Sequence, residues 1–161
     1  MNKKIYYLLA LVFSFSLLTF TACGDDDDDP VVTDNAALIA GTYNGDLSVK
    51  IEGQDDVVTK SDLALERTGD NKVKVSLKNF SFGELSLGDI VVDNIPVTKS
   101  NEKFNLAATT TAVTLDLFGA PISVDVTVSG AVEGNKLDLK IAVSKVPLLE
   151  NLNVTFSGNK K

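Results

Sequence analysis

Apolar and polar residues alternate along most of the chain from Gly41 onward. Successive side chains of a β-strand point to opposite faces of the sheet, so this alternation predicts strands with one buried face and one face in solvent. The clearest examples are residues 43–51, 73–77, 122–128 and 137–143. Their polar positions carry mainly Ser, Thr, Asn, Asp and Lys, which suits the solvent side.

Short turn sequences separate these segments and predict that consecutive strands are antiparallel neighbours. They are residues 53–56, 68–71, 119–121 and 133–136. No window predicts a long amphipathic helix, and residues 35–39 are too few for a helix that affects the fold. The predicted strands lie near residues 42–52, 57–67, 72–80, 86–93, 102–108, 111–118, 122–132, 136–146 and 151–157, with uncertain limits in 80–98 because Gly83, Gly88 and Pro96 interrupt the pattern.

The predicted fold is all-β: a single antiparallel up-and-down β-barrel of about eight strands over residues 41–158. Closure removes unpaired edges, and about eight strands leave an interior that side chains can fill. A barrel with its apolar face in a membrane would carry aromatic girdles, whereas this chain has no Trp and three Tyr. We therefore expect the apolar face inside, with Leu63, Leu65, Phe104, Leu115, Leu117, Leu152, Val154 and Phe156 in the core.

The N-terminal segment has the layout of a bacterial lipoprotein signal peptide. Lys3 and Lys4 precede the uncharged, mainly apolar residues 5–20, and small residues then lead to Cys23, the single cysteine. A transmembrane helix needs about 20 apolar residues, more than this segment offers. We predict a lipoprotein signal peptide over 1–22, lipid attachment at Cys23 and no disulfide.

Residues 23–40 are predicted to comprise the lipidated cysteine and an acidic spacer. Residues 25–29 are all Asp, a run that favours a solvated, extended spacer. The run also resembles the surface-export signal of lipoproteins from Bacteroidetes-type bacteria. The expected location is the outer membrane, lipid-anchored and facing the cell exterior. No basic patch points to nucleic acid as a partner.

The composition argues against an enzyme. There is no His, and Cys23 is assigned to the lipid, so imidazole-based triads, thiol nucleophiles and imidazole metal sites are excluded. We expect no catalytic residues, no cofactor and no metal site. The acidic residues of the strands fall on the polar phase and are interpreted as surface charges: Asp46, Asp62, Asp116, Asp125 and Asp138.

Residues 77–83, which include Asn-Phe-Ser-Phe, and residues 87–98 resemble the calycin-like, or lipocalin-like, β-barrel domains of Bacteroidetes lipoproteins. Residues 41–45 and 152–158 fit the same pattern, so the resemblance covers about residues 40–158. It implies an eight-stranded calycin barrel. Calycins bind small hydrophobic molecules in the barrel or contact proteins with its ends. Where lipocalins place Gly-x-Trp in the first strand, this chain has Tyr43.

Two functions remain open from the sequence. The first is a non-catalytic binding or structural module for an extracellular protein or glycan. The second is a carrier of a small hydrophobic ligand inside the barrel. Gly45 and Gly130 leave room on the inner phase, whereas Thr59 and Ser61 are the only inward polar groups noted, and pockets usually contain some. The sequence does not decide between a filled and a hollow interior.

Overall fold

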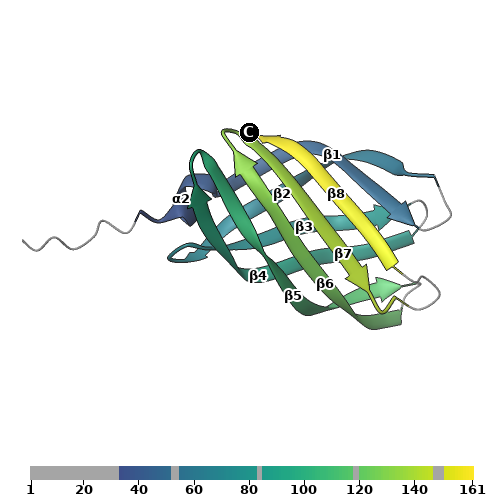
Figure 1. Cartoon of the computed structure of the whole chain (residues 1–161). Coiled ribbons are helices and arrows are strands. Elements are labelled where there is room, and N and C mark those ends of the chain that lie inside the picture. The colour runs from purple at the N-terminus through teal and green to yellow at the C-terminus, as the bar shows by residue number, and fades with distance from the viewer. Residues whose placement is uncertain (1–32, 52–54, 83–84, 118–119, 147–150) are drawn as a thin grey trace, which may run out of the picture. The chain divides into compact units, whose positions relative to one another are not determined.

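The computed structural model describes residues 33–51, 55–82, 85–117, 120–146 and 151–161. These residues form a closed antiparallel barrel in which each strand pairs with its sequence neighbours and β8 pairs with β1 (Figure 1). The predicted fold class is confirmed. The strands are β1 Gly41–Ile51, β2 Val57–Gly69, β3 Lys72–Phe82, β4 Leu85–Ser100, β5 Lys103–Leu117, β6 Ala120–Glu133, β7 Lys136–Ser144 and β8 Asn151–Lys160.

One strand was wrongly divided in the sequence-based prediction. The two segments predicted at 102–108 and 111–118 are the single strand β5. Its register against β6 shifts between Leu106 and Thr109, a β-bulge that changes the phase of the inward positions. The change of phase looked like a break between two strands. β4 is also longer than its predicted range of 86–93.

The inward side chains form one apolar core, and the predicted alternation is confirmed along the strands. In β7, for example, Leu137, Leu139, Ile141 and Val143 are at most 1% exposed, whereas the residues between them are exposed or half-buried. Of the predicted core residues, those that are fully buried are Leu63, Leu65, Leu115, Leu152, Val154 and Phe156, and Phe104 packs against them half-buried. The side chain of Leu117 lies outside the described part.

A five-residue helix, α2 (Asn35–Ile39), packs against one end of the barrel, so the expectation that this segment does not affect the fold was wrong (Figure 1). Ile39 is 2% exposed, and the Tyr43 hydroxyl donates a hydrogen bond of 2.8 Å to its carbonyl oxygen. Asp34 caps the helix by accepting from the backbone N–H of Ala36. The compact unit formed by the described residues starts at Thr33.

The inner-phase glycines are sites of close packing and do not leave room, contrary to the expectation from the sequence. A Cβ atom on Gly130 would lie 2.5 Å from the Asp138 carbonyl oxygen of the neighbouring strand. A Cβ on Gly158 would lie 2.6 Å from Cζ of Phe156, so this ring covers the glycine. Gly45 is the ladder partner of Gly158 in the β1–β8 ladder. A Cβ atom on Gly45 would clash with the Gly158 backbone. At Gly45 and Gly130 neighbouring strands approach closely, and at Gly158 the Phe156 ring takes the available space.

The barrel wall is less continuously paired around β3 and β4. Among the described residues, the β2–β3 ladder starts at Leu63↔Leu77, and the β4–β5 ladder is limited to Val97↔Leu106 through Ser100↔Lys103. Beyond those points the described residues of β3 and β4 pair only with each other. We name residues 78–82 and 85–96 the distal β3–β4 hairpin. No helix among the described residues is long and apolar enough to cross a membrane.

Candidate functional site

A hollow of about 570 Å³ lies on the barrel wall formed by β5, β6, β7 and β8. Its apolar base follows one rung of the sheet, in which Leu106, Gly130, Leu139 and Phe156 are consecutive ladder partners. Polar and small side chains on the outward positions surround this rung. We name the hollow the wall groove, and its outward members are Asn105, Ser129, Ala131, Asp138, Lys140, Thr155 and Ser157.

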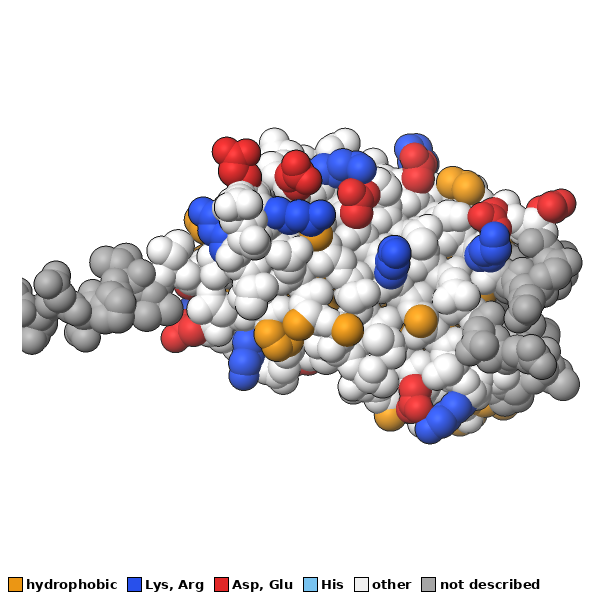
Figure 2. Space-filling view, in the orientation of Figure 1, with side chains coloured by type: hydrophobic (Ala, Val, Ile, Leu, Met, Phe, Trp, Pro, Cys, Tyr) orange, Lys and Arg blue, Asp and Glu red, His pale blue; other side chains and the backbone are white. Residues whose placement is uncertain are grey.

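The small size of the outward side chains explains why this wall is hollowed. Ser129 and Ala131 stand on either side of Gly130, where β6 approaches the backbone of β7 closely. Thr155 and Ser157 occupy the corresponding outward positions of β8. Figure 2 shows the molecule in the orientation of Figure 1 as a mainly white surface on which acidic and basic side chains lie next to one another in several places. Two charged side chains, Asp138 and Lys140, line the groove, and most of its exposed surface is apolar.

Asp138 is a fixed anionic acceptor within the wall groove. Its Oδ1 accepts a hydrogen bond of 2.6 Å from the Ser157 hydroxyl, and its Oδ2 lies 3.0 Å from the Lys136 ammonium. These two contacts, the Ser157 bond first, lower the pKa of Asp138 below the usual value of an aspartate. The carboxylate is thus ionised at neutral pH and held in one orientation for a ligand with hydroxyl or amine donors.

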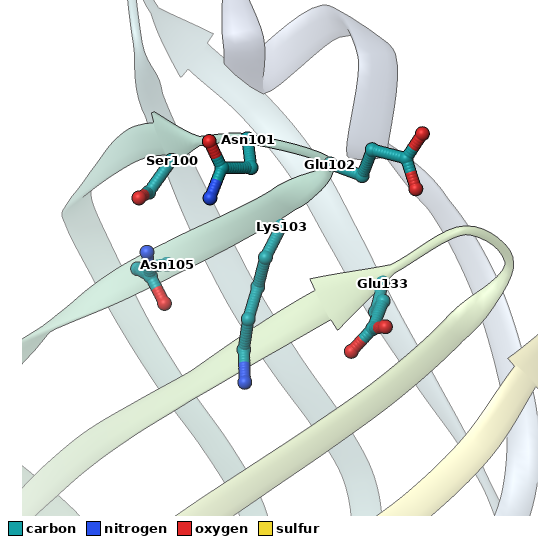
Figure 3. Close-up of a pocket in the computed structure, with 6 residues that line it drawn as sticks. All are labelled: Ser100, Asn101, Glu102, Lys103, Asn105 and Glu133. Carbon is teal, nitrogen blue, oxygen red and sulfur yellow. The ribbon is translucent and has the colours of Figure 1, made fainter.

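A second hollow, also about 570 Å³, adjoins the first at the β4–β5 turn. Figure 3 shows its lining: Ser100, Asn101, Glu102, Lys103 and Asn105 from the β4–β5 hairpin, and Glu133 from β6. Asn105 lines both hollows, which are therefore neighbours on the barrel wall. Lys103 and Glu133 are ladder partners. In the part of the chain that the structure describes, no three His, Cys, Asp or Glu side chains gather in a way that could hold a metal ion.

The structure distributes the residues singled out from the sequence over several places. Cys23 lies outside the described residues. Thr59 is exposed and Ser61 half-buried near the start of β2, away from the wall groove. The five strand aspartates are exposed or half-buried, as predicted, and one of them, Asp138, lines the wall groove.

Sequence reasoning missed most of the wall groove. Its members include Asn105, Ser129, Thr155 and Ser157, which were treated only as the polar halves of alternating strands. The available signal was the run of small hydroxyl and amide residues on the outward phase of four successive strands. That signal gains meaning only when the register places the residues side by side.

A solved structure with a similar fold is described as a "putative outer membrane protein" from Bacteroides fragilis NCTC 9343. The superposition has a TM-score of 0.59 with 20% sequence identity, and covers 78% of this chain and 52% of that one. This chain therefore spans about half the length of the Bacteroides protein, and the likeness concerns the fold alone. No protein with a curated description matches the chain significantly.

The sequence itself matches a family profile. The profile described as "Calycin-like beta-barrel domain" matches residues 39–159, which include all eight strands apart from the last residue of β8. This range agrees with the closed eight-stranded barrel and with the segments that carry the resemblance in the sequence. The chain belongs to the family of calycin-like β-barrel domains.

Proposed function

We propose that this protein is a non-catalytic binding module that holds an extracellular glycan in the wall groove. The observation that carries the proposal is the row of polar groups on rigid, fully paired strands. Ser129, Asp138, Thr155 and Ser157 offer hydroxyl and carboxylate groups around one concave surface. Sugar hydroxyls are both donors and acceptors, and such groups satisfy them in both roles.

The character of the groove favours a glycan over a protein partner. Protein interfaces depend on buried aromatic, Arg or large aliphatic anchors that fill pockets. The outward members of the wall groove are small or polar, and its apolar members, Leu106, Leu139 and Phe156, are at most 3% exposed. A ligand that combines hydrogen bonds with flat apolar faces, as a sugar ring does, suits this surface better than one that binds through large apolar anchors.

The alternative function, a carrier of a small hydrophobic ligand, has less support. A carrier needs an apolar void on the scale of a ligand. The Phe156 ring occupies the space that a side chain at Gly158 would take. Ile39 of α2 is buried in the same core cluster.

The proposed location is the outer membrane, with Cys23 as the lipid attachment site and the barrel facing the cell exterior. The signal-peptide layout before Cys23 and the Asp run after it support this arrangement. The fold similarity to a protein described as an outer membrane protein agrees with it. In this arrangement the lipid on Cys23 attaches the protein to the membrane, and the wall groove binds the ligand.

Glycan binding can be tested by filling the groove. Full-length protein in mild detergent is applied to an array of bacterial and host glycans, and the affinity for the best glycan is then measured in solution. Ala131→Trp places a large ring among the groove residues and should weaken binding about tenfold or more. Ser123→Trp is the matched control, because Ser123 is an exposed outward residue of β6 outside the groove.

An absence of glycan binding, or equal losses in the two variants, would contradict the proposal. Unfolding temperatures of both variants should stay near that of the parent protein. They show whether a loss of binding reflects a filled groove or a damaged fold.

The anchor is tested separately. Cys23→Ser should abolish incorporation of a clickable palmitate analogue, and unchanged labelling would refute lipid attachment at this residue. Deleting residues 25–29 should keep the labelling but reduce removal of the protein by protease treatment of intact cells. Equal removal of both forms would show that the Asp run does not direct export.

A further inference from the structure

Among the described residues, one strand edge in the barrel wall has no ladder partner. Residues 57–62 of β2 pair with β1, from Val57↔Val49 to Asp62↔Asn44. On the other side, among the described residues, β2 pairs with β3 only from Leu63 onward. Backbone N–H and C=O groups of a strand alternate between its two edges, so about half of those in 57–62 point to the side without a ladder. We name this side the free edge of β2.

The side chains along the free edge are unusually apolar for an exposed strand. Val57 is 42% exposed and Val58 is 60% exposed, and they lie on opposite faces of the strand. The next residue, Thr59, is also exposed although it has the inward phase. Natural proteins usually protect exposed edges with charges, proline or bulges, and residues 57–59 carry none of these. Such an edge is well suited to pairing with another strand.

The charges near the edge are already neutralised within the chain. The Lys60 ammonium lies 2.6 Å from the Asp46 carboxylate. Asp62 accepts hydrogen bonds of 2.8 Å from Lys161 and 2.7 Å from Asn44. These pairs lie on the outward face, so the charged side chains of residues 57–62 are already paired within the chain. An uncharged strand matches it best.

We propose that the free edge of β2 binds an extended, uncharged, β-branched peptide segment of a partner protein by strand addition. The partner's backbone supplies the missing ladder, and its side chains pack against Val57 and Val58. The free edge lies on β2, whereas the wall groove lies on β5 to β8. The two proposals therefore stand or fall separately.

The test uses a neutral probe peptide of alternating threonine and valine, six residues long, with blocked ends and a fluorophore. Its binding to the full-length protein in mild detergent is followed by fluorescence anisotropy. The matched control is the same peptide N-methylated at alternate residues, which removes the N–H groups of one edge. Losing two or three hydrogen bonds of about 1 kcal/mol each should weaken binding tenfold or more.

Two proline variants locate the interaction on the protein. Successive residues of a strand point their N–H groups to opposite edges, and proline has no N–H group. One of the variants Val58→Pro and Thr59→Pro therefore removes a donor from the free edge. The other removes a donor from the ladder with β1. The free-edge variant should keep its unfolding temperature and lose peptide binding about tenfold. The other variant should lose thermal stability.

Three results would overturn the proposal. The first is that the unmethylated peptide shows no saturable binding. The second is that the N-methylated peptide binds with the same affinity as the unmethylated one. Both comparisons need only the unmodified protein, so they decide the matter even where a proline variant does not fold. The third is that the Thr59→Cys variant forms a disulfide-linked homodimer in the native membrane, whereas the Thr155→Cys variant, at a position that is also exposed, does not. That result would assign the edge to a second copy of the chain.

Discussion

Adjacent residues of β7 experience opposite environments. Leu139 is 1% exposed in the core, whereas Lys140 is exposed on the outer wall. We expect Leu139→Asp to cost several kcal/mol or to prevent folding, because it buries a carboxylate without a partner. Lys140→Asp should change the free energy of unfolding by about 0.5 kcal/mol or less. Chemical denaturation of both variants measures the difference, and similar stabilities would show that the register of β7 is wrong.

Asp34 ties α2 to the barrel through a titratable contact. The hydrogen bond from Arg67, and next the backbone N–H of Asn71, lower the pKa of this carboxyl below its usual value of 3.8. A lowered pKa in the folded state means that the carboxylate stabilises the fold fully above pH 3.8. This contribution is lost as the pH falls through the lowered pKa.

Asp34→Asn should therefore lower the unfolding temperature at neutral pH, and the difference from the parent protein should shrink as the pH falls below about 3.8. Asparagine is also a good N-cap, so the substitution isolates the charge. Asp70→Asn is the control, because Asp70 contacts the same Arg67 from an exposed turn and should change less. A difference that stays constant with pH would show that the charge of Asp34 does not stabilise the fold.

At the level of elements, the distal β3–β4 hairpin differs from the rest of the barrel. Its two strands pair with each other, for example Phe82↔Leu85, but the neighbouring ladders end at Leu63↔Leu77 and Val97↔Leu106. Asn79 and Asn94, both with positive φ, lie at register shifts in this hairpin. These irregularities bend the two strands away from a regular ladder.

We expect the amides of residues 78–82 and 85–96 to fall into two classes in hydrogen exchange. Those that point to the partner strand of the hairpin should be protected, and those that point outward to β2 or β5 should exchange rapidly. The amides of β7, which has nine paired residues on each side, should be protected throughout. Exchange measured residue by residue by NMR tests this, and uniform protection in both elements would contradict it.

At the level of the whole molecule, the central expectation is a filled barrel. Leu115 and Val126 are 1% and 0% exposed, and both point inward from neighbouring strands. Leu115→Trp and Val126→Trp should overpack this core and cost about 1–3 kcal/mol. An apolar fluorophore should not bind the parent protein. Stoichiometric dye binding that either variant abolishes at little cost in stability would show instead that the interior is a ligand cavity.

The sequence by itself determined the fold class and the faces of the strands. Alternation with a period of two is a local property, so Leu137 to Val143 could be assigned to the core without knowing any partner strand. The family resemblance depended on short local motifs as well, such as residues 77–83. The bulge after Leu106 was missed because the residues that follow it, Ala107 and Ala108, carry no turn signal.

Only the tertiary structure decided which residues form the candidate sites. Asn105, Ser129, Asp138 and Thr155 belong to four different strands and become neighbours only through the registers of three ladders. The free edge of β2 likewise depends on where its pairing with β3 starts, which no local pattern encodes. α2 is too short to be stable alone and forms because Ile39 is buried and Asp34 is bound by the β2–β3 turn. Contacts between distant segments set these features, and the local sequence does not report them.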